Sequence, residues 1–178
     1  GLLRSLAAQP AAGLQDNCRA IEKATESLAR AHEMFFATLG SVSVPREAVI
    51  EEAPNGSLYQ TNHRSTGSSF FVPRTSVQLM GEEQWEFARK SVLLDELYRQ
   101  AVDNTPNVVA AYFNADEPAD MNRYYPFIER PWEVYPNDLD MKQFNFFYEA
   151  DAEHNPGRKT VWTGIYADPA GRGWMLSC

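Results

Sequence analysis

The amino-acid sequence predicts an α+β fold, in which a long N-terminal helix precedes a sheet flanked by further helices. Apolar residues recur at helical spacing over residues 14–39 and again over 82–104. Between turn-forming clusters further along the chain lie short runs of β-forming residues. With 178 residues, 44% of them hydrophobic, the chain is long enough for one domain with a substantial core.

The first predicted helix spans residues 14–39, after a shorter helical stretch that is interrupted around Pro10–Gly13. Gly40 ends this helix. Its apolar stripe consists of residues spaced by three, four or seven positions: Leu14, Cys18, Ile21, Leu28, Phe35 and Leu39. We therefore expect one long amphipathic helix over residues 1–40 and a separate module over 41–178.

Turn-forming residues divide the rest of the chain into short elements. In order, we predict a loop-rich segment over 41–66 with a short helix after Ser43 and a turn at Pro54–Ser57, a strand at Phe70–Val72, a helix over Glu82–Asn104, a strand at Val108–Phe113, an ordered aromatic-rich loop over 116–138, a helix over Leu139–Ala150, and strands at Thr160–Tyr166 and Gly173–Cys178. The loop over 116–138 is predicted because this segment contains four prolines. Asp168–Gly171 fits a type I turn, which predicts a hairpin between the last two strands.

The chain carries a net charge of −8, from 24 acidic and 16 basic residues. A phosphate backbone or an anionic lipid surface would on average be repelled, so we expect no nucleic-acid partner. Cys18 and Cys178 are too few for a disulfide framework and wrongly spaced for a zinc site, and we expect both thiols to be buried. No apolar run is long enough to cross a bilayer and no secretory leader opens the chain, so we expect a soluble chain, compatible with an excised part of a membrane protein.

Catalytic motifs are absent from the sequence. His32, His63 and His154 lie outside any zinc-binding or nucleophile–base spacing, and no glycine-rich phosphate loop follows a predicted strand. We therefore expect a chain that is not itself an enzyme and that binds no cofactor. An enzyme with a non-standard site is kept as a third hypothesis.

Two acidic clusters raise the question of a metal site. One consists of Asp151, Glu153 and His154, and the other of Asp116, Glu117 and Asp120. Carboxylates and imidazoles bind divalent cations, but neither cluster has further ligands at a recognisable spacing or follows the pattern of a calcium-binding loop. For both clusters we favour a solvated loop without a metal.

Trp162, Gly164 and Tyr166 alternate along the last-but-one predicted strand, so all three face the same side of a sheet. A glycine between two aromatic rings leaves space, which suits the floor of a small pocket. The same face could instead receive a closely packed helix, because aromatic stripes usually belong to a hydrophobic core. From these residues alone both interpretations stay open.

Motifs in the C-terminal part of the chain resemble those of a known family. In chain order they are Asn107–Asn114, Asn122–Pro126, Phe146–Ala150, Asn155–Lys159, Val161–Thr163, Tyr166–Gly171 and Gly173–Met175. Together they resemble the Cache domains, the extracytoplasmic PAS-like sensor domains of bacterial receptors. Phe146 stands at the tryptophan position of that family's W-Y-x-x-A helix. The resemblance covers most of the chain, its specific part is residues 107–178, and the long N-terminal helix also suits the family.

The resemblance implies a PAS-like antiparallel sheet and a ligand such as an amino acid, a carboxylate or an amine. Tyr166 matches the family's pocket tyrosine, and Asp168 matches a common family position. Phe144 stands where amino-acid-binding members have an arginine, so the bidentate grip of that arginine on a carboxylate is not expected. Because the family continues with a further strand after Cys178, we expect the membrane-distal module of a double Cache region, truncated at its C-terminal end.

The leading hypothesis is a small-molecule sensor in the periplasmic or extracellular part of an inner-membrane receptor. Its cavity is expected between the sheet face that bears Trp162 and Tyr166 and the loop from Arg123 to Trp132, with Arg123 facing an anionic group of the ligand. The expected ligand-binding residues are Tyr112, Arg123, Tyr125, Phe144, Phe146, Trp162, Tyr166 and Asp168.

The N-terminal helix is expected to pair two receptor copies in a homodimer. It would also carry the signal toward a histidine kinase, chemoreceptor, cyclase or phosphatase module, as in two-component signalling or chemotaxis. The alternative is a structural or dimerising ectodomain of such a receptor that binds no ligand.

Overall fold

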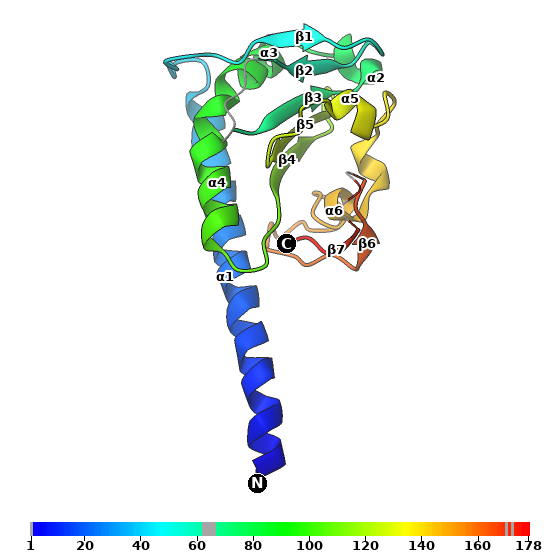
Figure 1. Cartoon of the computed structure of the whole chain (residues 1–178). Helices are drawn as coiled ribbons and strands as arrows, with labels where there is room; N and C mark the ends of the chain where they lie inside the picture. The colour runs from blue at the N-terminus through cyan, green and yellow to red at the C-terminus, as the bar shows by residue number, and fades with distance from the viewer. Residues whose placement is uncertain (1, 62–66, 170, 172) are drawn as a thin grey trace.

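The structure of the chain, a computed structural model, describes residues 2–61, 67–169, 171 and 173–178, with side chains from Gly13 onward. It confirms the predicted α+β class, because a long N-terminal helix leads into a five-stranded antiparallel sheet with flanking helices (Figure 1). The elements are α1 (Leu2–Thr38), β1 (Ile50–Glu52), β2 (Leu58–Gln60), β3 (Ser69–Val72), α2 (Arg74–Val77), α3 (Glu82–Lys90), the 3-10 helix η1 (Ser91–Leu94), α4 (Asp95–Asn104), β4 (Ala111–Ala115), β5 (Met121–Tyr125), α5 (Pro131–Val134), the 3-10 helix η2 (Met141–Gln143), α6 (Asn145–Tyr148), β6 (Tyr166–Ala167) and β7 (Trp174–Met175).

The five strands of the main sheet pair in the order β1-β2-β3-β5-β4, so β5 lies between β3 and β4. Asn122 of β5 pairs with Phe71 of β3 and with Asn114 of β4, and Tyr124 of β5 pairs with Tyr112 of β4. Side chains alternate across a strand, so these five residues share one face of the sheet. We call this face the pocket face and the opposite one the helix face.

The helix face is covered by α1, α3 and α4 (Figure 1). Phe36 of α1 stacks on Phe87 of α3 with 5.1 Å between the ring centroids, and Phe87 in turn lies 5.1 Å from the ring of Phe113 on β4. Phe70 of β3 and Tyr98 of α4 are fully buried in the same core. Burial of such large rings is a main source of hydrophobic stabilisation, so this core holds α1 against the sheet.

The pocket face is covered by the C-terminal part of the chain, from α5 to β7. Phe71 packs there with Tyr135, Leu139 and Met141 in a second, smaller hydrophobic cluster. Strands β6 and β7 form a separate two-stranded sheet, and the N–H of Gly171 donates to the carbonyl of Asp168 in the turn between them at 2.9 Å. The predicted hairpin is therefore confirmed, although both strands are shorter than predicted.

Helix α1 differs in two respects from the helix that the sequence predicts. It continues without a break through Pro10–Gly13, where neighbouring alanines favour the helix and a proline removes one backbone hydrogen bond without ending it. Leu28, Phe35 and Leu39 of the predicted apolar stripe pack into the core, whereas Leu14 is 65% exposed. The N-terminal half of α1 extends beyond the rest of the molecule (Figure 1).

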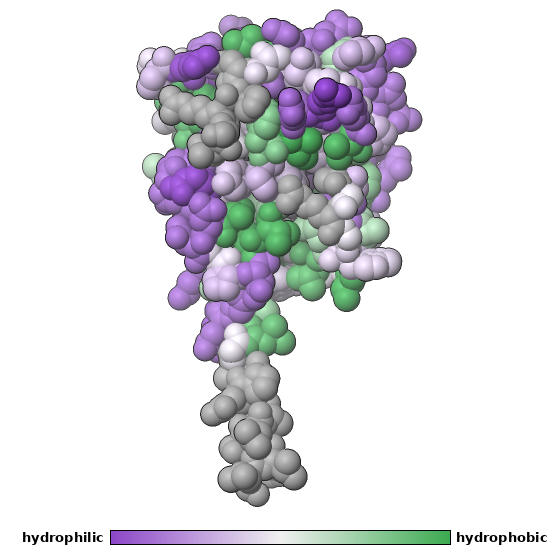
Figure 2. Space-filling view, viewed as in Figure 1, coloured by the Kyte–Doolittle hydropathy of each residue, from purple (hydrophilic) through white to green (hydrophobic). Residues whose placement is uncertain are grey.

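On the face shown in Figure 2, hydrophilic side chains dominate the upper part and hydrophobic ones gather in groups in the middle and lower parts. Among the described residues, no helix is both long and apolar enough to span a bilayer.

Cys18 and Cys178 are half-buried thiols, rather than the fully buried ones expected. The part of the predicted loop that falls on residues 62–66, including His63, lies outside the described residues.

Three strands lie in segments that were predicted as loops. Strands β1 and β2 form a hairpin around the predicted turn, where the N–H of Ala53 donates to the carbonyl of Ser57 at 2.8 Å and Gly56 adopts φ +84°. The short helix predicted after Ser43 is absent from the described chain. Strand β5 lies inside the predicted aromatic-rich loop, because Pro118 and Pro126 flank this strand rather than interrupt it.

The predicted helices after β3 are present in modified form. The helix over Glu82–Asn104 is confirmed in extent, but the 3-10 turn η1 separates its two α-helical parts. The helix predicted over Leu139–Ala150 is instead two short pieces, η2 and α6. The strand predicted at Val108–Phe113 begins later, at Ala111, and continues to Ala115.

His32 joins α1 to both α4 and the sheet. Its Nδ1–H donates to the carbonyl of Leu28 at 2.8 Å, so Nε2 is the acceptor for the hydroxyl of Tyr98 at 2.6 Å. The imidazole also stacks on Phe113 with 4.8 Å between the ring centroids. Burial lowers the pKa of His32, and the nearby Arg123 guanidinium acts in the same direction.

Replacing His32 with glutamine should flatten the pH dependence of the free energy of unfolding between about pH 7.5 and 5.5. Because the folded-state pKa lies below the unfolded value of 6.5, the stabilisation is fully present above pH 6.5 and is lost as the pH falls through the folded pKa. Denaturant unfolding at a series of pH values measures this slope.

His154 is the matched control for this measurement. Its Nδ1 lies 2.9 Å from the carboxylate of Asp151, which raises its pKa, so its contribution grows as the pH falls. His154→Gln should therefore not flatten the decline of the free energy of unfolding as the pH falls. A His32→Gln protein that loses stability with acid as steeply as the wild type would contradict the role given to His32.

Candidate ligand-binding site

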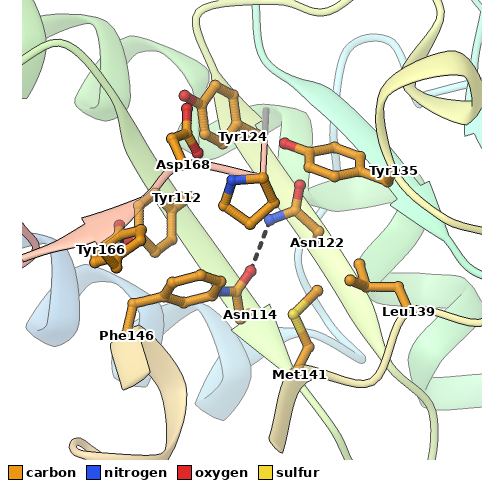
Figure 3. A pocket seen from close by; sticks show the side chains of 11 residues that line it. Tyr112, Asn114, Asn122, Tyr124, Tyr135, Leu139, Met141, Phe146, Tyr166 and Asp168 are labelled. Atoms are coloured by element: carbon orange, nitrogen blue, oxygen red, sulfur yellow. Dashed lines mark hydrogen bonds between the residues drawn. The ribbon is translucent and has the colours of Figure 1, made fainter. Parts of the chain in front are cut away.

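A pocket lies between the pocket face of the sheet and the C-terminal segment (Figure 3). It is lined by Tyr112, Asn114, Asn122, Tyr124, Tyr135, Leu139, Met141, Phe146, Tyr166, Asp168 and Pro169. About 370 Å³ in the pocket and at its mouth is not filled by atoms, and about 30 Å³ of that space can hold the centre of a water molecule. In this conformation the pocket therefore suits a ligand or ligand group of only a few heavy atoms.

Aromatic rings form most of the pocket wall. Tyr112 and Tyr124, side by side on β4 and β5, are nearly parallel with 6.0 Å between their centroids. Phe146 of α6 meets Tyr112 edge-on at 5.8 Å and lies 5.3 Å from the ring of Tyr166 on β6. These rings offer both apolar surface and the negative faces that attract cations.

Three hydroxyl groups join the β6–β7 hairpin to the edge strand β4. The hydroxyl of Tyr166 lies 2.6 Å from Oγ of Ser177 and 3.5 Å from the hydroxyl of Tyr112, which also bonds to Ser177. Burial raises the pKa of Tyr112 well above its ordinary value, so its phenol stays protonated at physiological pH. The cluster is therefore an uncharged hydrogen-bond network.

Two asparagines on neighbouring strands form the polar floor of the pocket. The side-chain N–H of Asn122 donates to Oδ1 of Asn114 at 2.6 Å, as the dashed line in Figure 3 shows. Asn122 is only 5% exposed, and its own Oδ1 has no hydrogen-bond partner among the described residues. Asp168, in the turn after β6, places a carboxylate on the pocket lining.

Asp120 fixes the segment that carries Met141 into the pocket lining. Its Oδ1 accepts the backbone N–H of Met141 at 3.1 Å, and its Oδ2 accepts the hydroxyl of Ser76 at 3.1 Å. The backbone N–H of Asp120 donates in turn to Oγ of Ser76 at 3.0 Å. Asp120 thus ties the β4–β5 loop to α2 and η2, and burial raises the pKa of its carboxyl group.

Four of the eight ligand-binding residues predicted from the sequence line this pocket: Tyr112, Phe146, Tyr166 and Asp168. Phe144 lies behind the lining, where its ring stacks on Phe146 at 5.0 Å. Tyr125 points into the core of the helix face. Arg123 and Trp162 lie elsewhere, each for a distinct physical reason.

Arg123 is fully buried on the helix face, so the expectation that it faces an anionic group of a ligand from the loop over Arg123 to Trp132 is wrong. Its Nη1 donates to Oε1 of Gln60 at 3.1 Å and to Oγ of Ser68 at 2.8 Å, and its Nη2 donates to the carbonyl of Ala88 at 3.1 Å. Asp95 supplies the counter-charge, with Oδ1 at 3.8 Å from Nη1. The guanidinium is therefore a structural group that links the sheet to α3 and α4.

Trp162 lies outside the pocket. Residues 160–165 are outside any strand, so Trp162 and Tyr166 do not share a sheet face as predicted. The indole N–H of Trp162 donates to Oε1 of Glu22 on α1 at 2.9 Å. This contact attaches the C-terminal segment to the N-terminal helix.

The sequence did not point to Asn114, Asn122, Tyr124 and Tyr135 as pocket residues. The signal that could have found the first three is the two-residue period of adjacent strands, which brings positions 112 and 114 beside positions 122 and 124. It was missed because β5 was predicted as a loop. Tyr135 follows α5, and nothing in the local sequence indicates its place in the pocket.

The two acidic clusters contact other groups of the protein. Oδ1 of Asp151 accepts the backbone N–H groups of Glu153 and His154 at 3.0 and 2.8 Å, which is a turn-stabilising arrangement. In the second cluster Lys142 lies 3.2 Å from Asp116 and 3.4 Å from Glu117. Within the described part of the chain, no three His, Cys, Asp or Glu side chains are grouped so as to hold a metal ion.

Comparisons of the chain with protein-family models, with curated proteins and with solved structures found no significant match.

Replacing Arg123 with methionine should lower the free energy of unfolding by about 3 kcal/mol or more, because Asp95 and the polar groups around it lose their buried partner. Urea unfolding followed by circular dichroism measures the loss. Arg130 is a matched control, since its exposed side chain pairs with Glu133 at 3.1 Å. Arg130→Met should change stability by no more than about 1 kcal/mol. A similarly small loss for Arg123→Met would contradict the structural role.

Proposed function

We propose that this chain is the extracytoplasmic small-molecule-sensing domain of a bacterial signal-transduction receptor. The observation that carries the proposal is the pocket, in which aromatic rings, an amide pair and a carboxylate converge on the sheet face opposite the helices. The Cache-like motifs of the C-terminal part support the same reading, because Tyr166 and Asp168 belong to those motifs and both line the pocket.

The β6–β7 hairpin is the element through which a bound ligand would act. Tyr166 contributes its ring to the pocket, and its hydroxyl bonds to Ser177 after β7. Ser177 also pairs with Thr163 on the other arm of the hairpin: the N–H of Thr163 donates to the carbonyl of Ser177 and the N–H of Ser177 donates to Oγ1 of Thr163, both at 2.9 Å. The two arms are therefore expected to move together.

The residues next to this pair contact α1. Trp162 precedes Thr163 and donates its indole N–H to Glu22 at 2.9 Å. Cys178 follows Ser177, and its carbonyl accepts the hydroxyl of Thr25 at 3.3 Å. Pocket and helix are thus connected through adjacent residues of one short segment.

A ligand that binds one arrangement of the hairpin more tightly than another would shift the population toward that arrangement. Because Glu22 and Thr25 lie on α1, the shift would reach this helix. In the proposal, α1 pairs two receptor copies in a homodimer and carries the signal to a kinase, methyl-accepting, cyclase or phosphatase module on the other side of an inner membrane. Sedimentation analysis would measure the pairing.

The alternative, a structural or dimerising ectodomain without a ligand, is favoured by one observation. The space that can hold the centre of a water molecule is only about 30 Å³ in this conformation. A ligand screen separates the two functions, since only a sensing domain gains stability from a compound that binds its native state.

A thermal-shift screen with amino acids, short carboxylates, amines and purines should find at least one compound that raises the melting temperature by a few degrees near saturation. Tyr166→Ala should abolish that shift, because it removes one wall of the pocket. Ile165→Ala is the matched control, since Ile165 is adjacent in sequence and 70% exposed. If no compound in the screen raises the melting temperature, the structural alternative is correct. A shift that survives in Tyr166→Ala would place the ligand elsewhere.

A further inference from the structure

Asn122 is the polar group on which the choice of ligand depends. It lies on the interior strand β5 and is only 5% exposed, and no described residue donates a hydrogen bond to its side-chain oxygen. Figure 3 shows its amide among the lining side chains, with the nitrogen directed at Asn114 and the oxygen on the opposite side of the amide. A buried carbonyl without a donor is unfavourable, so this oxygen is a position where a ligand gains a hydrogen bond.

The two asparagines could in principle reverse their amides together, which would turn an N–H of Asn122 toward the ligand instead. The charge of the pocket decides between these orientations. Asp168 contributes a carboxylate to the lining, and the described lining residues include no lysine, arginine or histidine. Arg123, the next residue along β5, is a buried cation. Its side chain lies on the helix face of the sheet, where its own partners hold it. An anionic ligand would therefore meet the carboxylate of Asp168 and no cation among the described lining residues.

The aromatic rings of the pocket wall also favour a positively charged ligand over a negatively charged one. The rings of Tyr112, Tyr124 and Phe146 border the pocket. The negative face of an aromatic ring attracts a cation and repels a carboxylate. Amide oxygen, carboxylate and rings thus all complement a positively charged hydrogen-bond donor.

We infer that the pocket binds a small organic cation that carries N–H groups, an ammonium or an amidinium, and that Asn122 selects it by accepting one of those N–H groups. The positive charge faces Asp168, and the apolar part of the ligand lies against Tyr112 and Tyr124. This inference rests on the proposed function, since it names the class of ligand for the same pocket.

Three probes of the same shape and different charge test the inference: acetamidinium, acetamide and acetate. Each is titrated into the ¹⁵N-labelled wild-type chain at constant ionic strength, and the shifts of pocket resonances give a dissociation constant. Acetamidinium should bind at least about tenfold more tightly than acetamide, because a hydrogen bond to a charged donor is the stronger one. Acetate should bind more weakly still. If acetate binds the wild-type chain as tightly as acetamidinium or more tightly, that result alone overturns the inference.

Two substitutions at Asn122 separate selection of the ligand from a merely structural role. Asn122→Leu keeps the size of the side chain but removes the acceptor, and should weaken acetamidinium binding about tenfold or more. Asn122→Asp keeps an acceptor of the same size, and should bind acetamidinium at least as tightly as the wild type. A merely structural asparagine would predict similar losses for both variants. Asn137→Leu, at an exposed asparagine outside the pocket, should leave the affinity unchanged.

The outcomes distinguish this inference from the function on which it rests. If acetate or another carboxylate binds in the pocket and Tyr166→Ala abolishes that binding, the pocket is a ligand site but the inferred charge is wrong. If Asn122→Leu binds acetamidinium as tightly as the wild type, Asn122 does not select the ligand. If the broad screen finds no ligand of any class, the proposed function fails together with the inference.

Discussion

The burial of Arg123 on the helix face of β5 is the constraint on which the pocket depends. Its guanidinium bonds to Gln60, Ser68 and the carbonyl of Ala88, so β5 cannot shift without leaving a buried charge unpaired. A one-residue slip would turn every side chain of the strand to the other face. Because Arg123 is held toward the helices, Asn122 and Tyr124 must point away from them, and they become the floor and wall of the pocket.

The two faces of the sheet therefore have different tasks. On the helix face, rings from α1, α3 and β4 pack together and His32 ties α1 to α4, which gives a rigid support. On the pocket face, short elements held by individual hydrogen bonds surround a small space, and the Asp120 contacts to Ser76 and Met141 are examples. The hairpin that closes the pocket also contacts α1 through Glu22 and Thr25, so the helix is attached to both faces.

Regular hydrophobic patterns in the sequence predicted much of this fold. The period of α1, the run Phe70–Val72, the helical segment over Glu82–Asn104 and the hairpin turn all depend on local signals. Strand β5 could not be predicted in this way, because Met-Asn-Arg-Tyr-Tyr shows no alternation of apolar and polar residues. It is buried on both faces, and the hydrogen-bond partners of its arginine lie 35 or more positions away in sequence. Four pocket residues were predicted, whereas Asn122 and Tyr124 depended on recognising that strand.

A crystal structure of the chain grown with acetamidinium tests the central claim most directly. The account predicts density for the cation on the pocket face, within hydrogen-bond distance of Oδ1 of Asn122 and bordered by Tyr166, with Arg123 still bonded to Ser68 on the other face. Density for the cation elsewhere, with an unoccupied or water-filled pocket, would contradict the ligand assignment. A guanidinium of Arg123 turned into the pocket would contradict the register of β5 and with it the division of the sheet into two faces.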